Sequence, residues 1–597
     1  MVTSSFVHPA LGFLALALVL PFMRGKGWQW LLLAPPLLAV WAVFTMQPGA
    51  HMTVDWLGQT LVLGRVDKLS LVFAQVFAVM SVAGMLYAMH VQDKGQHIAA
   101  ALYVSGGFGC VFAGDYLTLF LFWELMSIGS TFLVMLQRSR ESVLAGFRYF
   151  MYHTAGGLLL LAGLLLRYKA LGTWSFDGVT APGVWNGGEL YDWLILAGFC
   201  VNAAVVPLHA WLPDAYPRGT VTGSVFMCAY TTKTAVYVLL RGFAGWEVLA
   251  IAGTVMAVYG VLYACIENNA RRILSYHIVS QVGYMVAGIG VGTAMTMNGA
   301  VAHAYAHILY KGLLFMGTGC LLYAAGTAKL DKLGGLAARL PWVMLLYMVA
   351  ALSISGMPVF NGFISKTMTI TGAAEAHRTF IALGLEIAAV GTFISVGIKL
   401  PYFAFWGGKE TDHARELTPI PWNMYAGMGL LASLCILQGV APSILYAYLP
   451  FDVAHPYVPW TPWHVLQSLL ILGFSGLAFY VLRTVITPHA GLNLDFDWFY
   501  RLAGRSALAF VCKPLAWLDD RWTEAYRAGG LRGLMGVACG SAWFDRKAID
   551  GVVDGSACTV MGVGRLGART QNANIQDYIG LAAVLAMGVF GLVWYFG

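Results

Sequence analysis

The chain has 597 residues, of which 59% are hydrophobic and 11% are charged, and its mean hydropathy is +0.71. This composition excludes a soluble globular protein, because soluble domains carry about 25% charged residues. The formal charge of +7 does not indicate a nucleic-acid partner, because the basic residues are spread over many loops. We therefore predict a polytopic membrane protein with no nucleic-acid partner.

Apolar runs long enough to span a bilayer recur along the whole chain. A helix needs about 20 apolar residues to cross the hydrocarbon core, and we count about sixteen such runs. Residues 1–105 contain the first of them, and the run near 12–23 lacks a cleavage site, so we expect it to be retained. A dense helical block follows at 106–405, and further spanning helices follow at 406–492.

The composition changes in segment 493–576, which mixes basic and acidic residues with tryptophans such as Trp517 and Trp522. This mixture predicts one or more amphipathic helices that lie on the membrane surface or on partner subunits. An ordinary cytoplasmic loop domain is the alternative. A last apolar run in 577–597 is predicted to cross the bilayer again.

Lysine and arginine content alternates between successive short loops. By the positive-inside rule the basic loops are cytoplasmic, which places both termini outside the cytoplasm and the chain in the cell inner (plasma) membrane. The basic loop residues are Arg24, Lys26, Arg138, Arg140, Arg271, Arg272, Lys329, Lys332, Arg339, Lys409 and Arg415.

The sequence offers no ligand set for a cofactor. Its nine cysteines are scattered without a CxxC pair, so we interpret them as small apolar core residues. There is no glycine-rich nucleotide-binding motif either. We predict that this chain carries no metal and no redox cofactor.

Two spanning segments are interrupted. NAAVVPLHAWLPDAYP contains Pro207 and Pro213, and SISGMPVFNGFISK contains Gly356 and Pro358. A break at membrane depth frees backbone groups and is tolerated only where protein or water satisfies them. Two breaks in corresponding positions indicate an internal repeat and an ion pathway.

Ionisable side chains recur every four residues at His303, His307 and Lys311. This spacing places them on one face of a helix, and an ionisable group at bilayer depth marks a path for protons or ions. A metal site is the alternative for the two histidines. We expect none, because no glutamate follows His303 and Lys311 stands where a third ligand would be.

Other ionisable groups lie in apolar runs. A carboxylate at Glu124 must be paired or protonated there, and Glu386 is a further intramembrane acid. Lys233 lies near mid-helix, although it could instead reach an interface. Lys366 follows the second break and could instead cap helix carbonyls. His153 and His277 are more simply explained by core packing.

Six motifs resemble successive motifs of the antiporter-like subunits of respiratory complex I, Mrp-type sodium/proton antiporters and energy-converting membrane hydrogenases. They run in order from about Gly106 to Lys366. The resemblance implies an all-α fold with two inverted five-helix repeats, each with a broken helix. The motifs are DYLTLFLFWELMSI, VVPLHAWLPDAYPRGTVTGSV, TTKTAVYVLLR, RRILSYHIVSQVGYM, HAYAHILYKGLLFM and SGMPVFNGFISK.

The resemblance assigns a role to each ionisable residue. Glu124 would be the acid of the first half-channel, and Lys233 would be the bridging lysine. His303, His307 and Lys311 would form the central connection, and Lys366 would be the exit-side lysine. Asn202 departs from the family, which has a lysine there that pairs with the glutamate. An amide cannot carry that charge. Either another base such as Lys233 or His153 takes over, or the subunit conducts without this gate, or it is a passive scaffold.

We therefore expect a proton-translocating subunit, not itself catalytic, of an NADH:quinone oxidoreductase-like or membrane hydrogenase-like complex. Its partners would be other membrane subunits, lipids and protons or sodium, with the redox chemistry in other chains. The tail resembles the lateral helix of the distal complex I subunit. The alternatives are an Mrp-type sodium/proton antiporter module without a redox partner, and a structural membrane-arm subunit that does not pump.

Overall fold

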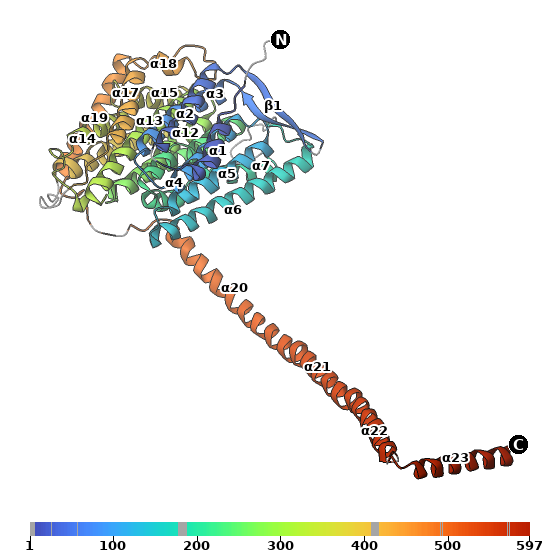
Figure 1. Ribbon diagram of the computed structural model, residues 1–597. Coiled ribbons are helices and arrows are strands. Elements are labelled where there is room, and N and C mark those ends of the chain that lie inside the picture. Colours follow the sequence, from blue (N-terminus) through green and yellow to red (C-terminus); the bar gives the residue numbers. More distant parts are fainter. Residues whose placement is uncertain are drawn as a thin grey trace. The chain divides into compact units, whose positions relative to one another are not determined.

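The computed structural model describes residues 6–25, 27–56, 58–176, 188–407, 417–489, 491, 493–569, 571 and 573–597. Contacts divide the chain into two units, Met1–Phe496 and Asp497–Gly597, which we describe separately (Figure 1). Lys26, Lys409 and Arg415, which entered the topology prediction, lie outside the described residues.

Ten helices in the described ranges are long and apolar enough to cross a membrane, which makes the chain a mostly helical multi-pass membrane protein. The predicted number of sixteen spanning helices stays a prediction. The ten are Trp28–Thr45 (η2 and α2), α3 Lys68–Ala88, α5 Tyr116–Met135, α6 Arg140–Leu171, α11 Glu247–Ile266, α13 Ala294–Ala325, Thr379–Trp406 (α16, η5 and η6), α17 Trp422–Val440, α19 Pro462–Leu482 and α23 Ile575–Phe596.

The remaining helices of the first unit are shorter or less apolar. Two of them, α4 and α12, are nevertheless long and almost wholly buried. The set comprises α1 Pro9–Val19, α4 Lys94–Phe112, α7 Leu190–Asn202, α8 Trp211–Ala215, α9 Val221–Met227, α10 Thr231–Gly242, α12 Ala270–Val291, α14 Pro341–Ser355, α15 Asn361–Glu375 and α18 Ser443–Tyr446.

One hairpin corrects the prediction of an all-α chain. Strand β1, Gly49–Trp56, pairs antiparallel with β2, Gln59–Val66, so that Trp56 lies opposite Gln59 (Figure 1). Alternating polar residues and β-branched residues favour strands in this segment. Gly58 has φ +75°, which a tight turn between two strands requires.

Helix α13 lies in the core of the first unit, and nearly all of its side chains are buried. It begins where the Thr293 side chain accepts a hydrogen bond from the Thr296 amide and ends at Gly326, which adopts a left-handed conformation. Its neighbours include α3, α12, α14, α15 and α17. Any ionisable side chain on α13 therefore faces protein on every side.

Both proline-containing breaks are present, one between α7 and α8 and one between α14 and α15. Each contains a non-glycine residue with positive φ, Ala204 at +56° and Val359 at +84°. Such residues cost about 1–3 kcal/mol and persist where the surrounding structure enforces them, often at functional sites. A third interruption separates α9 from α10, and no proline in 221–242 signals it.

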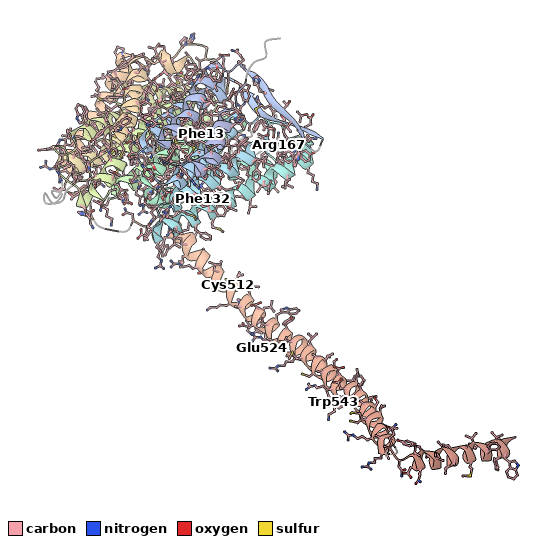
Figure 2. The ribbon with its side chains drawn as sticks, viewed as in Figure 1. Phe13, Phe132, Arg167, Cys512, Glu524 and Trp543 are labelled. Atoms are coloured by element: carbon pink, nitrogen blue, oxygen red, sulfur yellow. The ribbon has the colours of Figure 1, made fainter. Side chains whose placement is uncertain are left out.

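The second unit is a run of helices whose described side chains are exposed, as Cys512, Glu524 and Trp543 illustrate in Figure 2. Arginines and tryptophans share these helices, as an amphipathic surface segment requires. The unit consists of α20 Asp497–Ala525, η7 Tyr526–Leu531, α21 Arg532–Phe544, η8 Asp545–Ile549, α22 Asp550–Arg569 and α23.

Candidate functional site

The predicted row on α13 is fully buried: His303, His307 and Lys311 have no exposed surface. The ring centroids of the two histidines are 6.3 Å apart. His303 Nδ1 lies 3.0 Å from the hydroxyl of Ser365 on α15. The row therefore reaches the residue next to Lys366.

Part of this row has no protein partner. Both ring nitrogens of His307 and the Lys311 ammonium form no hydrogen bond with any described residue. Buried polar groups are almost always hydrogen-bonded to protein or to ordered water, and an unpaired buried charge is costly. The inner end of the row therefore lacks the protein partners that would stabilise a buried charge.

Two lysines flank the row in similar surroundings. Lys233 Nζ donates to the carbonyl of Cys228 at 2.7 Å, and Lys366 Nζ donates to the carbonyl of Ile354 at 2.6 Å. Each carbonyl lies at a helix interruption, where backbone acceptors lack an intrahelical partner. The Lys366 contact is also the one that the capping alternative predicts.

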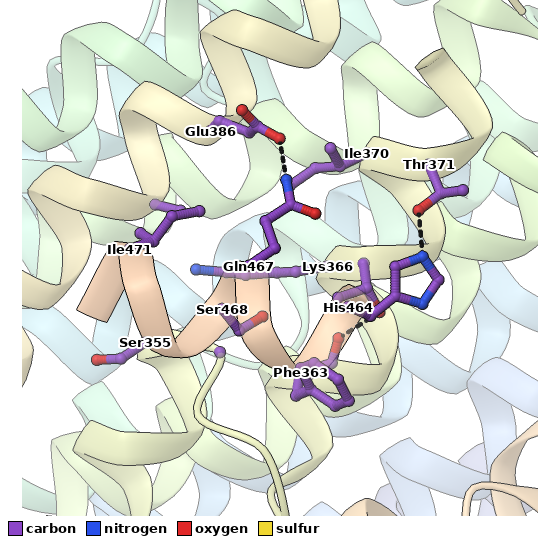
Figure 3. A pocket seen from close by; sticks show the side chains of 13 residues that line it. Ser355, Phe363, Lys366, Ile370, Thr371, Glu386, His464, Gln467, Ser468 and Ile471 are labelled. Atoms are coloured by element: carbon purple, nitrogen blue, oxygen red, sulfur yellow. Dashed lines mark hydrogen bonds between the residues drawn. The ribbon is translucent and has the colours of Figure 1, made fainter. Parts of the chain in front are cut away.

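Lys366 and Glu386 line one small cavity of about 50 Å³, together with residues of α19 (Figure 3). Gln467 Nε2 donates to Glu386 Oε1 at 2.6 Å, and His464 Nε2 lies 3.4 Å from the Thr371 hydroxyl. Sequence reasoning missed Gln467 and His464. The sequence pattern that could have identified them is a pair of polar residues one turn apart, at the start of the apolar helix α19.

Two residues that the resemblance assigns to the first half-channel, Glu124 and Asn202, both contact α6. Glu124 on α5 is half-buried, and a Cβ atom at Gly157 of α6 would collide with its carboxylate. His153 lies one turn before Gly157, and its Nδ1 is 2.8 Å from Oδ1 of Asn202. The contact between His153 and Asn202 was not predicted, because the two residues lie on different helices.

The ion pairs of the described residues contain none of the ionisable residues of the predicted proton path. Arg241 pairs with Asp67 at 2.8 Å, and Arg148 pairs with Asp214 at 2.7 Å. The ion pairs found within the described ranges include none of the four buried lysines, Lys233, Lys311, Lys366 and Lys399. The described residues also contain no group of three His, Cys, Asp or Glu side chains that could hold a metal ion.

Residues 113–395 match the family model described as "NADH:quinone oxidoreductase/Mrp antiporter, TM". Hydrogenase-4 component B of Escherichia coli (strain K12) is 29% identical over 456 residues, covering 68% of this chain and 66% of that protein. This chain thus spans just under two thirds of that relative's length. A Na+/H+ antiporter subunit of Alkalihalophilus pseudofirmus is 30% identical over 368 residues, covering 58% of this chain and 72% of that protein.

Solved structures share the fold. A chain in the Mrp complex from Dietzia sp. DQ12-45-1b is 22% identical with a TM-score of 0.62, covering 78% of this chain and 95% of that one. A chain of respiratory complex I from Thermus thermophilus is 23% identical with a TM-score of 0.64, and the match covers 74% of this chain and 99% of that one. A chain of an archaeal membrane-bound sulfane sulfur reductase has a TM-score of 0.65 at 23% identity, covering 74% and 95%.

Proposed function

We propose that this chain, which belongs to the NADH:quinone oxidoreductase/Mrp antiporter transmembrane family, translocates protons as one subunit of a larger membrane complex. The observation that carries the proposal is the buried row of His303, His307 and Lys311 on α13. Its inner groups have neither a carboxylate nor a hydrogen-bond partner among the described residues. Ionisable groups of this kind in membrane proteins form proton relays.

The path has an entrance, a centre and an exit. Lys233 connects the entrance to the central row, and the contact between His303 and Ser365 leads to Lys366. Lys366 shares a cavity with Glu386 (Figure 3), and we place the opening of this cavity on the outer side. Each of two inverted five-helix repeats would contain one broken helix. This arrangement explains why there are two breaks, each with one non-glycine residue in a left-handed backbone conformation, Ala204 and Val359.

His153 takes the role of the lysine that Asn202 replaces. When its Nδ1–H donates to Asn202 Oδ1, the lone pair of Nε2 remains free to accept a proton, and Nε2 has no partner among the described residues. Gly157, one turn away on the same face of α6, contacts the Glu124 carboxylate. Successive positions on one helical face are about 6 Å apart, a distance that one water molecule can bridge.

The redox chemistry of the proposed complex takes place in other subunits, and this chain carries no cofactor. Segment 493–576 lies along neighbouring subunits or the membrane surface, and both termini are outside the cytoplasm. Flavin or iron–sulfur absorbance in the complex, purified through a tag on this chain, supports a redox partner. Absence of both supports an antiporter module instead.

The test is proton uptake by the purified complex in proteoliposomes. Lys311→Ala should reduce the initial rate about 100-fold, the size typical of removing a positioned proton-transfer group. Lys332→Ala is the matched control, because Lys332 is exposed. If uptake by Lys311→Ala equals that of the control, the structural-subunit alternative is correct. Asn202→Lys restores the lysine that the family pairs with the glutamate, and it tests whether that pair can replace His153.

The second candidate function is sodium/proton exchange. The outer cavity offers several oxygen atoms, from Glu386, Gln467 and Thr371, and hard cations bind oxygen ligands. Proton movement that requires a sodium gradient and is lost in Glu386→Gln would favour this candidate. Uptake that is independent of sodium would exclude it.

A further inference from the structure

A buried carboxylate joins the break after α7 to the start of the C-terminal helices. Asp495 lies two residues before the second unit, and only 2% of its side chain is exposed. One carboxylate oxygen is 3.3 Å from Nε2 of His209, which lies inside the break and is fully buried. The other accepts a hydrogen bond from the Tyr276 hydroxyl at 2.7 Å.

The segment around Asp495 is fixed to the ends of two core helices. Tyr259 on α11 also donates a short hydrogen bond to the carboxylate, and Tyr263 donates to the carbonyl of Leu494 at 3.0 Å. Asn493 Nδ2 lies 3.4 Å from Glu267 Oε2. Glu267 in turn pairs with Arg272 on α12 at 3.4 Å.

A purely structural tether would not need a charge at this place. Burying a carboxylate is costly unless a cation and hydrogen bonds compensate for the lost water. Within the described residues, the basic side chain at ion-pair distance from Asp495 is the imidazole of His209, which is charged only when it is protonated. Neither ring nitrogen of His209 forms a hydrogen bond of suitable geometry with those residues.

We propose that Asp495 is a positioning residue whose carboxylate fixes the His209 imidazole in the break between α7 and α8. The break carries Asn202 at one end and His209 within it, so this contact fixes a residue of the same break that holds the departure from the family. The inference rests on the proposed function.

The experiment uses the full chain in its native complex. Asp495→Asn removes the charge and keeps one oxygen that can accept a tyrosine hydrogen bond, and we expect the initial rate of proton uptake to fall about tenfold. Asp495→Glu should restore most of the rate because it restores the charge. The matched control is Asp497→Asn, since Asp497 is a nearby acidic residue that pairs with Arg501 of its own helix. A wild-type rate in Asp495→Asn overturns the proposal.

A second measurement separates this inference from the proposed function. Hydrogen–deuterium exchange of peptides covering 203–210 should become faster in Asp495→Asn and stay unchanged in Asp497→Asn. Unchanged exchange in both variants overturns the positioning role. If the wild-type complex takes up no protons, the proposed function fails, and faster exchange in Asp495→Asn alone still supports the contact with His209.

Discussion

At the scale of single residues, the entrance depends on how closely α5 and α6 approach each other. Glu124 faces Gly157, and no side chain larger than hydrogen fits between the carboxylate and the α6 backbone. His153 lies one turn away and holds Asn202. The position of Glu124 relative to His153 is therefore set by the absence of a Cβ atom at residue 157.

Gly157→Ala should displace the Glu124 carboxylate and lower the initial rate of proton uptake about tenfold, because proton transfer requires groups within hydrogen-bond reach or one water apart. Gly473→Ala on α19 is the control, since nothing lies within 4 Å of a Cβ atom there. Uptake assays on both variants, normalised to the amount of complex, measure the difference. Equal rates would show that Glu124 does not depend on this contact.

Some of these residues could be predicted from sequence and others could not, for a physical reason. The spacing of His303, His307 and Lys311 fixes their common face whatever surrounds the helix. The meeting of Glu386 with Gln467 depends on how α16 packs against α19, which local sequence does not encode. The sequence leaves His153 either as a packed core residue or as a base that replaces the missing lysine, because its partner Asn202 is 49 positions away.

At the scale of elements, the two proline-containing breaks could be predicted because proline lacks a backbone donor and ends a helix. The interruption between α9 and α10 could not, because it contains no proline. The hairpin of β1 and β2 was missed because its strands are short and lie between long apolar helices. Tertiary contacts decide such elements more than local propensity does.

The link between the break at His209 and the segment after α19 has a pH dependence whose sign can be derived. Burial alone would raise the pKa of the Asp495 carboxyl, but the contacts with His209, Tyr259 and Tyr276 hold that pKa well below its usual value. A depressed pKa contributes stability that is complete above the unfolded value of about 4 and is lost as the pH falls toward the folded value.

We therefore expect Asp495→Asn to lower the thermal unfolding midpoint at about pH 5.5, and by less below about pH 4. Scanning fluorimetry of the detergent-solubilised complex measures these midpoints, with Asp497→Asn as the control. An effect that is as large below about pH 4 as at about pH 5.5 would show that the charge of Asp495 does not stabilise this contact.

At the scale of the whole molecule, the membrane topology that the basic loops predict can be tested through the exposed cysteines. The arginine-rich segment 493–576 follows α19 on the side that the positive-inside rule assigns to the cytoplasm. Its cysteines, Cys512, Cys539 and Cys558, are exposed, whereas the other six are buried or half-buried. A thiol reagent that cannot cross the bilayer therefore reports which side this segment occupies.

We expect a membrane-impermeant maleimide to label the chain in inside-out vesicles and to leave it nearly unlabelled in right-side-out vesicles. The reason is that thiol reactivity requires access, and the buried cysteines are shielded by packing. Serine at positions 512, 539 and 558 should abolish the labelling, which assigns the signal to this segment. Strong labelling in right-side-out vesicles would place the segment outside, reverse the orientation of every spanning helix and turn the cavity at Lys366 toward the cytoplasm.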